Sequence, residues 1–218
     1  GFQVVVAAQC LGLKAEGTIA AWGDNDHGQC DVPEPNENFV AIARGGDHSL
    51  GLKFDGMIVV WGDNAFGQCD VPPPNTGFVA VSGGAYHSLG LKADGGIVAW
   101  GRNSSGQCSV PAPNAAFVAV AGGSAHTLGL KSDGTIVAWG QNTYGQCDVP
   151  EPNTGFVAVA AGWFHSLGLR SDESVEAWGR NNYGQGEVAG PGDGFVSLSA
   201  GGYHNLGLRN AALSHAGD

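Results

Sequence analysis

Positive charge is scarce in this chain. It contains 9 Lys and Arg residues against 20 Asp and Glu residues, so its formal net charge at pH 7 is −11. Binding to a nucleic-acid backbone requires clustered cations, so we expect no nucleic-acid partner. An anionic lipid surface is disfavoured for the same reason, and no apolar run is long enough to cross a membrane as a helix. We therefore expect no membrane partner either.

The chain also lacks the motifs of common enzymes and metal sites. Its five cysteines include no Cys-x-x-Cys pair, which argues against a zinc site. No serine stands in a nucleophile-elbow context, and no glycine-rich phosphate loop precedes a helical pattern. Helix-period patterns are absent throughout. The sequence therefore predicts neither an enzyme nor a bound cofactor or metal.

What the chain has is a repeat of 39 residues. The register aligns five Trp-Gly pairs, five phenylalanines and five histidines: Trp22, Trp61, Trp100, Trp139 and Trp178; Phe39, Phe78, Phe117, Phe156 and Phe195; His48, His87, His126, His165 and His204. Self-similarity at a period near 40 is typical of solenoids, propellers and other repeat arrays. Glycine is abundant, with 38 residues, but it recurs at fixed repeat positions, which indicates turns rather than disorder.

Each repeat contains three short runs typical of β-strands. The first resembles FVAVA at 156–160, the second is HSLGLK with leucines at period two, and the third is IVAWG. An Asp-Gly pair between the second and third runs favours a tight hairpin turn. The following GQCxVPxPN segment has two prolines and is expected to connect one repeat to the next. The unit is therefore an antiparallel meander of three strands, or of four if the connection adds an edge strand.

Radial repetition of such sheets predicts an all-β fold, a β-propeller of about six short blades. We expect a single propeller domain over residues 1–218, with units at 1–39, 40–78, 79–117, 118–156, 157–195 and a partial unit at 196–218. The third strand of the last unit is expected within its degenerate closing segment, RNAALSHAGD. A fragment of a seven-bladed ring is the alternative, because both end units depart from the repeat pattern.

The motif GGxxHSLGLKxDGxIVAWGxNxxGQ resembles the regulator-of-chromosome-condensation repeat over nearly the whole chain. The short 39-residue form, with its VPxP connection, is similar to beta-lactamase inhibitory proteins of the second type. This resemblance implies a propeller, usually of seven blades, that serves as a protein-binding surface. Relatives that exchange nucleotide on a small GTPase carry longer repeats and long insertions, which this chain lacks. Exchange activity is therefore not expected.

The polar residues that recur in every repeat are expected to be structural. The histidines would brace the adjoining turn by hydrogen bonding to backbone, since ring symmetry spreads them too far apart to share a metal. The Asp of Asp-Gly and the Asn of WGxN are expected to bond turn and loop backbone. Cys30, Cys69, Cys108 and Cys147 share one repeat position and are expected to be half-buried free thiols. Reduced thiols are typical of a cytoplasmic protein, whereas a secreted protein would have lost its signal peptide. Both the cytoplasm and secretion therefore remain alternatives for the location of this protein.

Function is expected at the positions that change between copies. They lie in the turn before each His and in the loop after WGxN, and an antiparallel meander brings both to the same end of the blades. One face would then display aromatic rings with polar residues at one edge: Phe66, Tyr86, Tyr144, Trp163, Phe164, Tyr183 and Tyr203; Asp26, His27 and Asp47. Aromatic side chains on rigid loops are typical of binding hot spots. The alternative is that these rings fold over neighbouring blades and cap the core.

The sequence thus predicts a non-enzymatic scaffold that binds a protein partner through this face. In the inhibitors that the chain resembles, aromatics at matching loop positions carry binding, so the resemblance implies a beta-lactamase-like enzyme as the partner. The alternative function is a structural repeat module of a larger surface or secreted protein, without a specific binding face.

Overall fold

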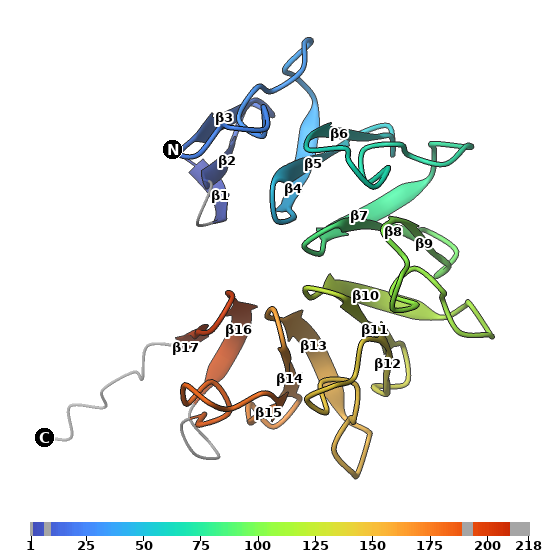
Figure 1. Ribbon diagram of the computed structural model, residues 1–218, viewed down its shortest axis with the longest axis vertical. Helices are drawn as coiled ribbons and strands as arrows, with labels where there is room; N and C mark the ends of the chain where they lie inside the picture. Colours follow the sequence, from blue (N-terminus) through green and yellow to red (C-terminus); the bar gives the residue numbers. More distant parts are fainter. Residues whose placement is uncertain (1, 7–9, 189–193, 210–218) are drawn as a thin grey trace, which may run out of the picture.

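The computed structural model describes residues 2–6, 10–188 and 194–209. In these ranges the regular secondary structure consists of β-strands only. The described part accordingly contains no helix long and apolar enough to cross a membrane. The predicted all-β fold is confirmed. Its strands are arranged as a propeller of short sheets around a common axis (Figure 1).

The strands form six sheets in chain order. Sheet 1 contains β1 (Phe2–Val6), β2 (Cys10–Lys14) and β3 (Ile19–Trp22), and sheet 2 contains β4 (Phe39–Arg44), β5 (His48–Lys53) and β6 (Ile58–Gly62). Sheet 3 contains β7 (Phe78–Gly83), β8 (His87–Lys92) and β9 (Ile97–Gly101), and sheet 4 contains β10 (Phe117–Gly122), β11 (His126–Lys131) and β12 (Ile136–Gly140). Sheet 5 contains β13 (Phe156–Ala161), β14 (His165–Arg170) and β15 (Val175–Gly179), and sheet 6 contains β16 (Phe195–Ala200) and β17 (Asn205–Arg209). The third strand expected in the closing segment lies outside the described residues.

Each sheet is an antiparallel meander of consecutive strands. In sheet 4, for example, Leu128 of β11 pairs with Ala121 of β10 on one side and with Ala138 of β12 on the other. The proline-containing connection adds no strand to any sheet in the described ranges. The repeat therefore folds as three strands, the smaller of the two numbers expected.

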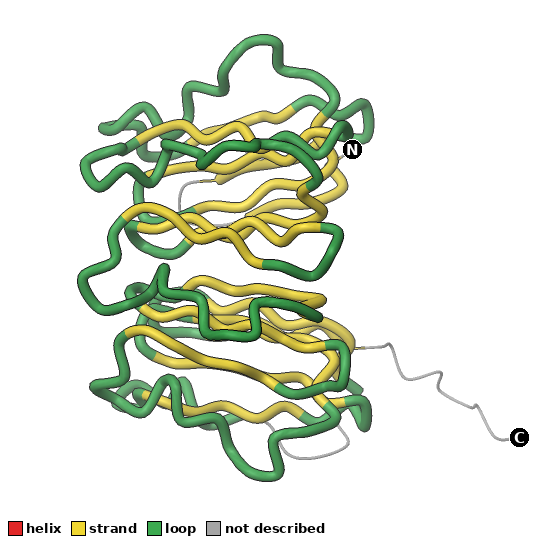
Figure 2. The backbone as a smooth tube through the Cα atoms, turned by 90° about the vertical axis from the view of Figure 1, so that its right-hand side faces the viewer, coloured by secondary structure: helices red, strands yellow, loops and turns green. Residues whose placement is uncertain are grey.

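The first strand of each sheet lies innermost, and β4, β7, β10, β13 and β16 line a central channel of about 1130 Å³. Their small residues allow this close approach to the axis. Figure 1 shows the sheets following one another around the channel, with an opening between sheet 1 and sheet 6. Seen from the side, the loops lie at the two ends of the strands and so form two opposite faces (Figure 2).

Apolar side chains fill the space between neighbouring sheets. Leu128 and Leu130 of sheet 4 pack against Phe156 and Trp178 of sheet 5, and the other sheets repeat this arrangement. Leu206 on β17 occupies the repeat position of Leu128, yet it is 64% exposed. Among the described residues, no further sheet covers this side of β17.

A chain of buried hydrogen bonds also joins each sheet to the next. The Nε2 atom of His126 lies 3.0 Å from the Oγ of Ser166 in sheet 5, and this hydroxyl donates to the carbonyl of Gln146 at 2.8 Å. The indole of Trp178 donates to the same carbonyl at 2.9 Å. The prediction that these histidines brace their own turn is therefore corrected. Neighbouring sheets pack closely enough for the imidazole to reach across to the next sheet.

Burial keeps these histidines neutral. It lowers the pKa of His48 to about 4, of His87 to about 3 and of His126 to about 4. The pKa of His165 is lowered in the same direction, chiefly by burial. At neutral pH the imidazoles therefore act as uncharged links between sheets.

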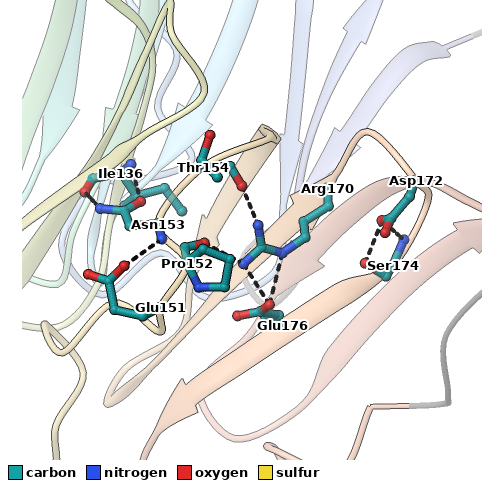
Figure 3. A network of polar contacts seen from close by, with 9 residues as sticks. All are labelled: Ile136, Glu151, Pro152, Asn153, Thr154, Arg170, Asp172, Ser174 and Glu176. Atoms are coloured by element: carbon teal, nitrogen blue, oxygen red, sulfur yellow. Dashed lines mark hydrogen bonds and ion pairs between the residues drawn. The ribbon is translucent and has the colours of Figure 1, made fainter.

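The proline-containing connection docks on the edge of the third strand (Figure 3). The side-chain amide of Asn153 accepts a hydrogen bond from the N–H of Ile136 and donates one to its carbonyl, both at 2.8 Å. Asn36, Asn75 and Asn114 make the same pair of bonds to Ile19, Ile58 and Ile97. These amides satisfy backbone groups that an open sheet edge would leave unpaired.

Four of the chain's nine cations bond the same connection: Lys53, Lys92, Lys131 and Arg170. Arg170 donates to the carbonyls of Pro152 and Thr154 and pairs with Glu176 at 2.7 Å (Figure 3). Its guanidinium also lies 4.1 Å from the ring of Phe156. Lysines at the equivalent position, such as Lys131, bond the carbonyl of the connection and cover the first-strand Phe in the same way. Six of the nine cations occupy this repeat position: Lys14, Lys53, Lys92, Lys131, Arg170 and Arg209.

The turn between the second and third strands follows the predicted Asp-Gly chemistry. The carboxylates of Asp55, Asp94, Asp133 and Asp172 accept the N–H two residues later at 2.9–3.1 Å. The residue directly after each of these aspartates has a positive φ angle. This angle is 80° at Gly134 in sheet 4, and it is 67° at Glu173 in sheet 5, where the residue is not glycine. A left-handed conformation is costly for a residue with a Cβ atom.

We therefore expect Glu173→Gly to stabilise the protein by about 1 kcal/mol. Urea unfolding at pH 7 measures the change. The same substitution at exposed Glu151, whose side chain accepts a backbone N–H, is the control and is expected to destabilise.

Candidate functional site

The two variable loops of each repeat do lie at one end of the strands, because strand one ends there, strand two begins there and strand three ends there. We call this end the loop face. The loops after strand three have a fixed shape. In sheet 4, the buried side chain of Gln146 accepts the N–H of Tyr144 at 2.9 Å, and Asn142 accepts the N–H of Cys147 at 2.8 Å. The same bonds hold Phe66 and Tyr183, so these tip residues sit on preorganised backbone.

The tip of one sheet lies beside the turn of the next, so the variable residues pair at a spacing of 20. The aromatic pairs are Phe66 with Tyr86, Tyr144 with Phe164, and Tyr183 with Tyr203, at ring-centroid distances of 5.3, 5.5 and 5.2 Å. All three pairs meet edge to face, the geometry that aromatic quadrupoles prefer. The 20-residue spacing was present in the sequence and could have identified these pairs.

Further ring contacts join two of these pairs into one patch. Tyr203 lies 5.3 Å from Trp163 and 6.4 Å from Phe164. The seven predicted aromatics therefore form two groups, which we name the small cluster and the large cluster: Phe66 and Tyr86; Tyr144, Trp163, Phe164, Tyr183 and Tyr203.

Most of these rings are open to solvent. Trp163 is 45% exposed, Tyr144 44% and Tyr183 68%, and Phe66 and Tyr203 are also exposed. Tyr86 and Phe164 are half-buried. The exposed rings pack against one another on the loop face, and none of the seven lies within the buried clusters between sheets.

The three predicted polar residues lie over sheets 1 and 2. Asp26 and His27 are exposed in the loop after β3, and the N–H of His27 donates to Gln29 at 2.8 Å. Asp47 is half-buried in the turn between β4 and β5, at the mouth of the channel with Tyr86, Trp163 and Tyr203. The ring contacts that form the two aromatic clusters do not include His27.

The site also contains two arginines that the sequence analysis did not predict. The guanidinium carbon of Arg102 lies 5.0 Å from the ring of Phe66 and 5.6 Å from that of Tyr86. Arg180 lies 5.1 to 5.7 Å from four rings of the large cluster: Tyr144, Phe164, Tyr183 and Tyr203. Both occupy the variable x of WGxN, which is Asp24, Asp63 or Gln141 in the other repeats. The change from Asp to Arg at this position is the signal that could have revealed them.

A notch of about 190 Å³ separates the two clusters. It is lined by Tyr86, Arg102 and a set of small polar residues from sheets 3 and 4, including Ser104, Ser105, Ser124 and Gln141. The loop face thus carries two aromatic clusters, each with an arginine, on either side of a polar depression.

The recurring Cys and His residues give no sign of chemistry. The described residues contain no group of three or more His, Cys, Asp and Glu side chains that could hold a metal ion. Cys69, Cys108 and Cys147 are half-buried free thiols, as predicted, and burial raises their pKa to about 11. Cys30, at the same repeat position, is also half-buried. A thiol that stays protonated is a poor nucleophile.

These features define a repeat propeller whose loops, rather than its sheets, differ between copies. The chain belongs to the family of regulator of chromosome condensation (RCC1) repeat proteins. The family model matches residues 39–68, 78–107, 117–146 and 156–185, which are 120 of the 218 residues. This family is defined by a structural repeat, and no catalytic family is indicated. A search of the curated proteins finds no match.

Solved structures share the fold. The ectodomain of the Physcomitrella patens receptor kinase CR4 matches at a TM-score of 0.75 and 24% identity, over 91% of this chain and 55% of that one. Prp20p from Saccharomyces cerevisiae matches at 0.78 and 19% identity, over 94% and 67%. Human WBSCR16 matches at 0.74 and 21% identity, over 95% and 72%. The chain thus spans about half to three quarters of the length of these proteins.

Proposed function

We propose that this protein is a binding scaffold that captures a protein partner on its loop face, through the two aromatic clusters. The observation that carries the proposal is the exposure of large rings on loops held by buried hydrogen bonds. Tyr and Trp provide contact area at a low cost in conformational entropy, and a fixed backbone reduces the ordering cost of docking. Prp20p, which shares the fold, is described with binding properties to Gsp1p and histones, and it has also been crystallised bound to Kap60.

The sharper form of the proposal is inhibition of a beta-lactamase-like enzyme by covering its active site. It rests on the similarity of the 39-residue repeat and its VPxP connection to beta-lactamase inhibitory proteins. Titration of the chain against a panel of purified beta-lactamases, with the hydrolysis rate as readout, tests this form. Unchanged rates across the panel would remove the enzyme target and leave the binding face in place.

The binding face itself is tested with a displayed library of random 12-residue peptides selected on the immobilised protein. For the peptides recovered, we expect Trp163→Ala or Tyr144→Ala to weaken binding by about 30-fold each, the effect of losing about 2 kcal/mol at a hot spot. Fluorescence anisotropy measures the Kd.

The matched control is Phe54→Ala. Phe54 is 84% exposed, but it lies in the turn between β5 and β6 on the opposite face. We expect this variant to bind normally. A loss at Phe54 equal to that at Trp163, or no selection above background, would favour the alternative of a structural repeat module without a specific binding face.

A further inference from the structure

The notch between the two clusters arises where aromatic residues are missing from the repeat pattern. Ser105 occupies the tip position that holds Phe66, Tyr144 or Tyr183 in other loops. Ser124 and Ala125 occupy the turn positions that hold Trp163 and Phe164 one repeat later. The turn that carries Trp163 is joined to the notch through the backbone, because the N–H of Ser124 donates to the carbonyl of Trp163 at 3.1 Å. The loop face therefore has a polar depression that is lined by Tyr86 of the small cluster and lies one repeat before the large cluster.

The guanidinium of Arg102 is fixed at the rim of this notch. Its Nε donates to the Oγ of Ser104 at 3.0 Å, and it lies over the rings of Phe66 and Tyr86. Within the described ranges, no hydrogen bond or ion pair engages its two terminal amino groups. The notch therefore contains several hydrogen-bond donors, which are these amino groups and the hydroxyls of Ser105 and Ser124. One of the groups is cationic, and no protein acceptor in the described ranges bonds its amino groups.

Arginine here also breaks a local rule of the repeat. Asp24 and Asp63, at the same position, accept the N–H two residues later at 3.1 Å and so cap their own loops. An arginine cannot accept a hydrogen bond, so the loop of sheet 3 loses this cap. In a chain with nine cations, six of which share one repeat position on the scaffold, such a placement points to a use outside the fold.

We infer that the notch receives a carboxylate side chain of the partner, an Asp or Glu that pairs with Arg102 while flanking apolar residues rest on the two clusters. This inference rests on the proposed function, since it assigns the partner chemistry of the same face. The volume of 190 Å³ equals that of about six water molecules, which suits one short side chain. A planar carboxylate matches the two-pronged geometry of a guanidinium. A phosphate dianion is usually held by several arginines, and only one lines this notch.

Selection from the random peptide library on two proteins tests the inference. On the native protein we expect peptides enriched in Asp or Glu at a fixed distance from an apolar residue. On Arg102→Gln we expect apolar peptides without this acidic position. For one synthetic peptide from the first set, Arg102→Gln or replacement of its Glu by Gln should each weaken binding at least about tenfold, and the two losses should not add. Because Arg102 is exposed, the variant is expected to keep the native melting temperature.

Charge reversal makes the test specific. Arg102→Glu should bind the peptide that carries Lys in place of Glu better than the parent peptide. Arg180→Gln is the control: Arg180 braces the large cluster, so this change should weaken all peptides without removing the preference for acid.

Each other outcome overturns the inference in a distinct way. Peptides that depend on Trp163 but show no acidic position would refute the notch and leave the proposed function intact. A phosphoserine peptide that binds tenfold tighter than its Glu counterpart would reassign the notch to phosphate. Self-association in sedimentation velocity that Arg102→Gln abolishes would assign it to a second copy. An absence of any selected peptide would refute the proposed function as well.

Discussion

Acidification from pH 7 to pH 4.5 is expected to unfold this propeller cooperatively. His48, His87 and His126 have pKa values of about 4, 3 and 4 in the folded state, against 6.5 when unfolded. Between these pH limits the unfolded chain binds protons at these histidines and the folded chain does not. The free energy of unfolding therefore keeps its full histidine contribution above pH 6.5 and decreases as the pH falls below this value. Each histidine contributes a slope of about 1.4 kcal/mol per pH unit. Three together remove roughly 8 kcal/mol over two units, which is comparable with the whole stability of a typical domain.

Urea unfolding at several pH values between 7 and 4.5, followed by tryptophan fluorescence, measures this slope. His87→Gln is the matched variant, because the first repeat carries Gln9 at the same position. It removes one protonation and should reduce the slope by about 1.4 kcal/mol per pH unit, whatever its effect at pH 7. The net charge of −11 opposes the effect, since self-repulsion eases as carboxylates are protonated. A native protein equally stable at pH 7 and 4.5 would contradict the burial of these imidazoles.

The histidines illustrate what a repeat sequence can and cannot predict. The turn bonds of Asp133 and the loop bonds of Asn142 were predictable, because they form between residues close in sequence. The link from His126 to Ser166 spans 40 residues and depends on how closely neighbouring sheets pack. Periodicity shows which residues occupy equivalent positions in successive repeats, but it contains no information on the distance between neighbouring sheets.

The loop face shows the same division. Strand order alone predicted that both variable loops share one end of the blades, and thus which rings lie on one face. It did not predict that seven rings separate into two clusters, because that separation follows from the small side chains of Ser105 and Ala125 in between. Arg102 and Arg180 were not predicted, because they stand at the variable x inside WGxN and the prediction considered only the loop after this motif. Side-chain contacts across sheets revealed their association with the rings.

The largest effect of a single substitution is expected at Leu128. This side chain is fully buried between sheets 4 and 5, where it packs with Phe156 and Trp178. Leu128→Ala removes apolar contacts and leaves a cavity that the surrounding sheets can close only in part. We expect a loss of about 3 kcal/mol, or a decrease in melting temperature of roughly 6 to 12 °C for a chain of this length. Differential scanning calorimetry at pH 7 measures it.

Leu206→Ala is the matched control, since the same residue type stands at the same repeat position. Leu206 is 64% exposed on β17, so truncation should cost less than about 0.5 kcal/mol. An equal loss at both positions would mean that something covers this side of β17 in solution. Repeating the comparison at a tenfold higher protein concentration identifies the source, because only cover by a second copy makes the Leu206 effect depend on concentration. The difference between two leucines at equivalent repeat positions, in HTLGLK and HNLGLR, thus measures how far the packing between sheets continues around the ring.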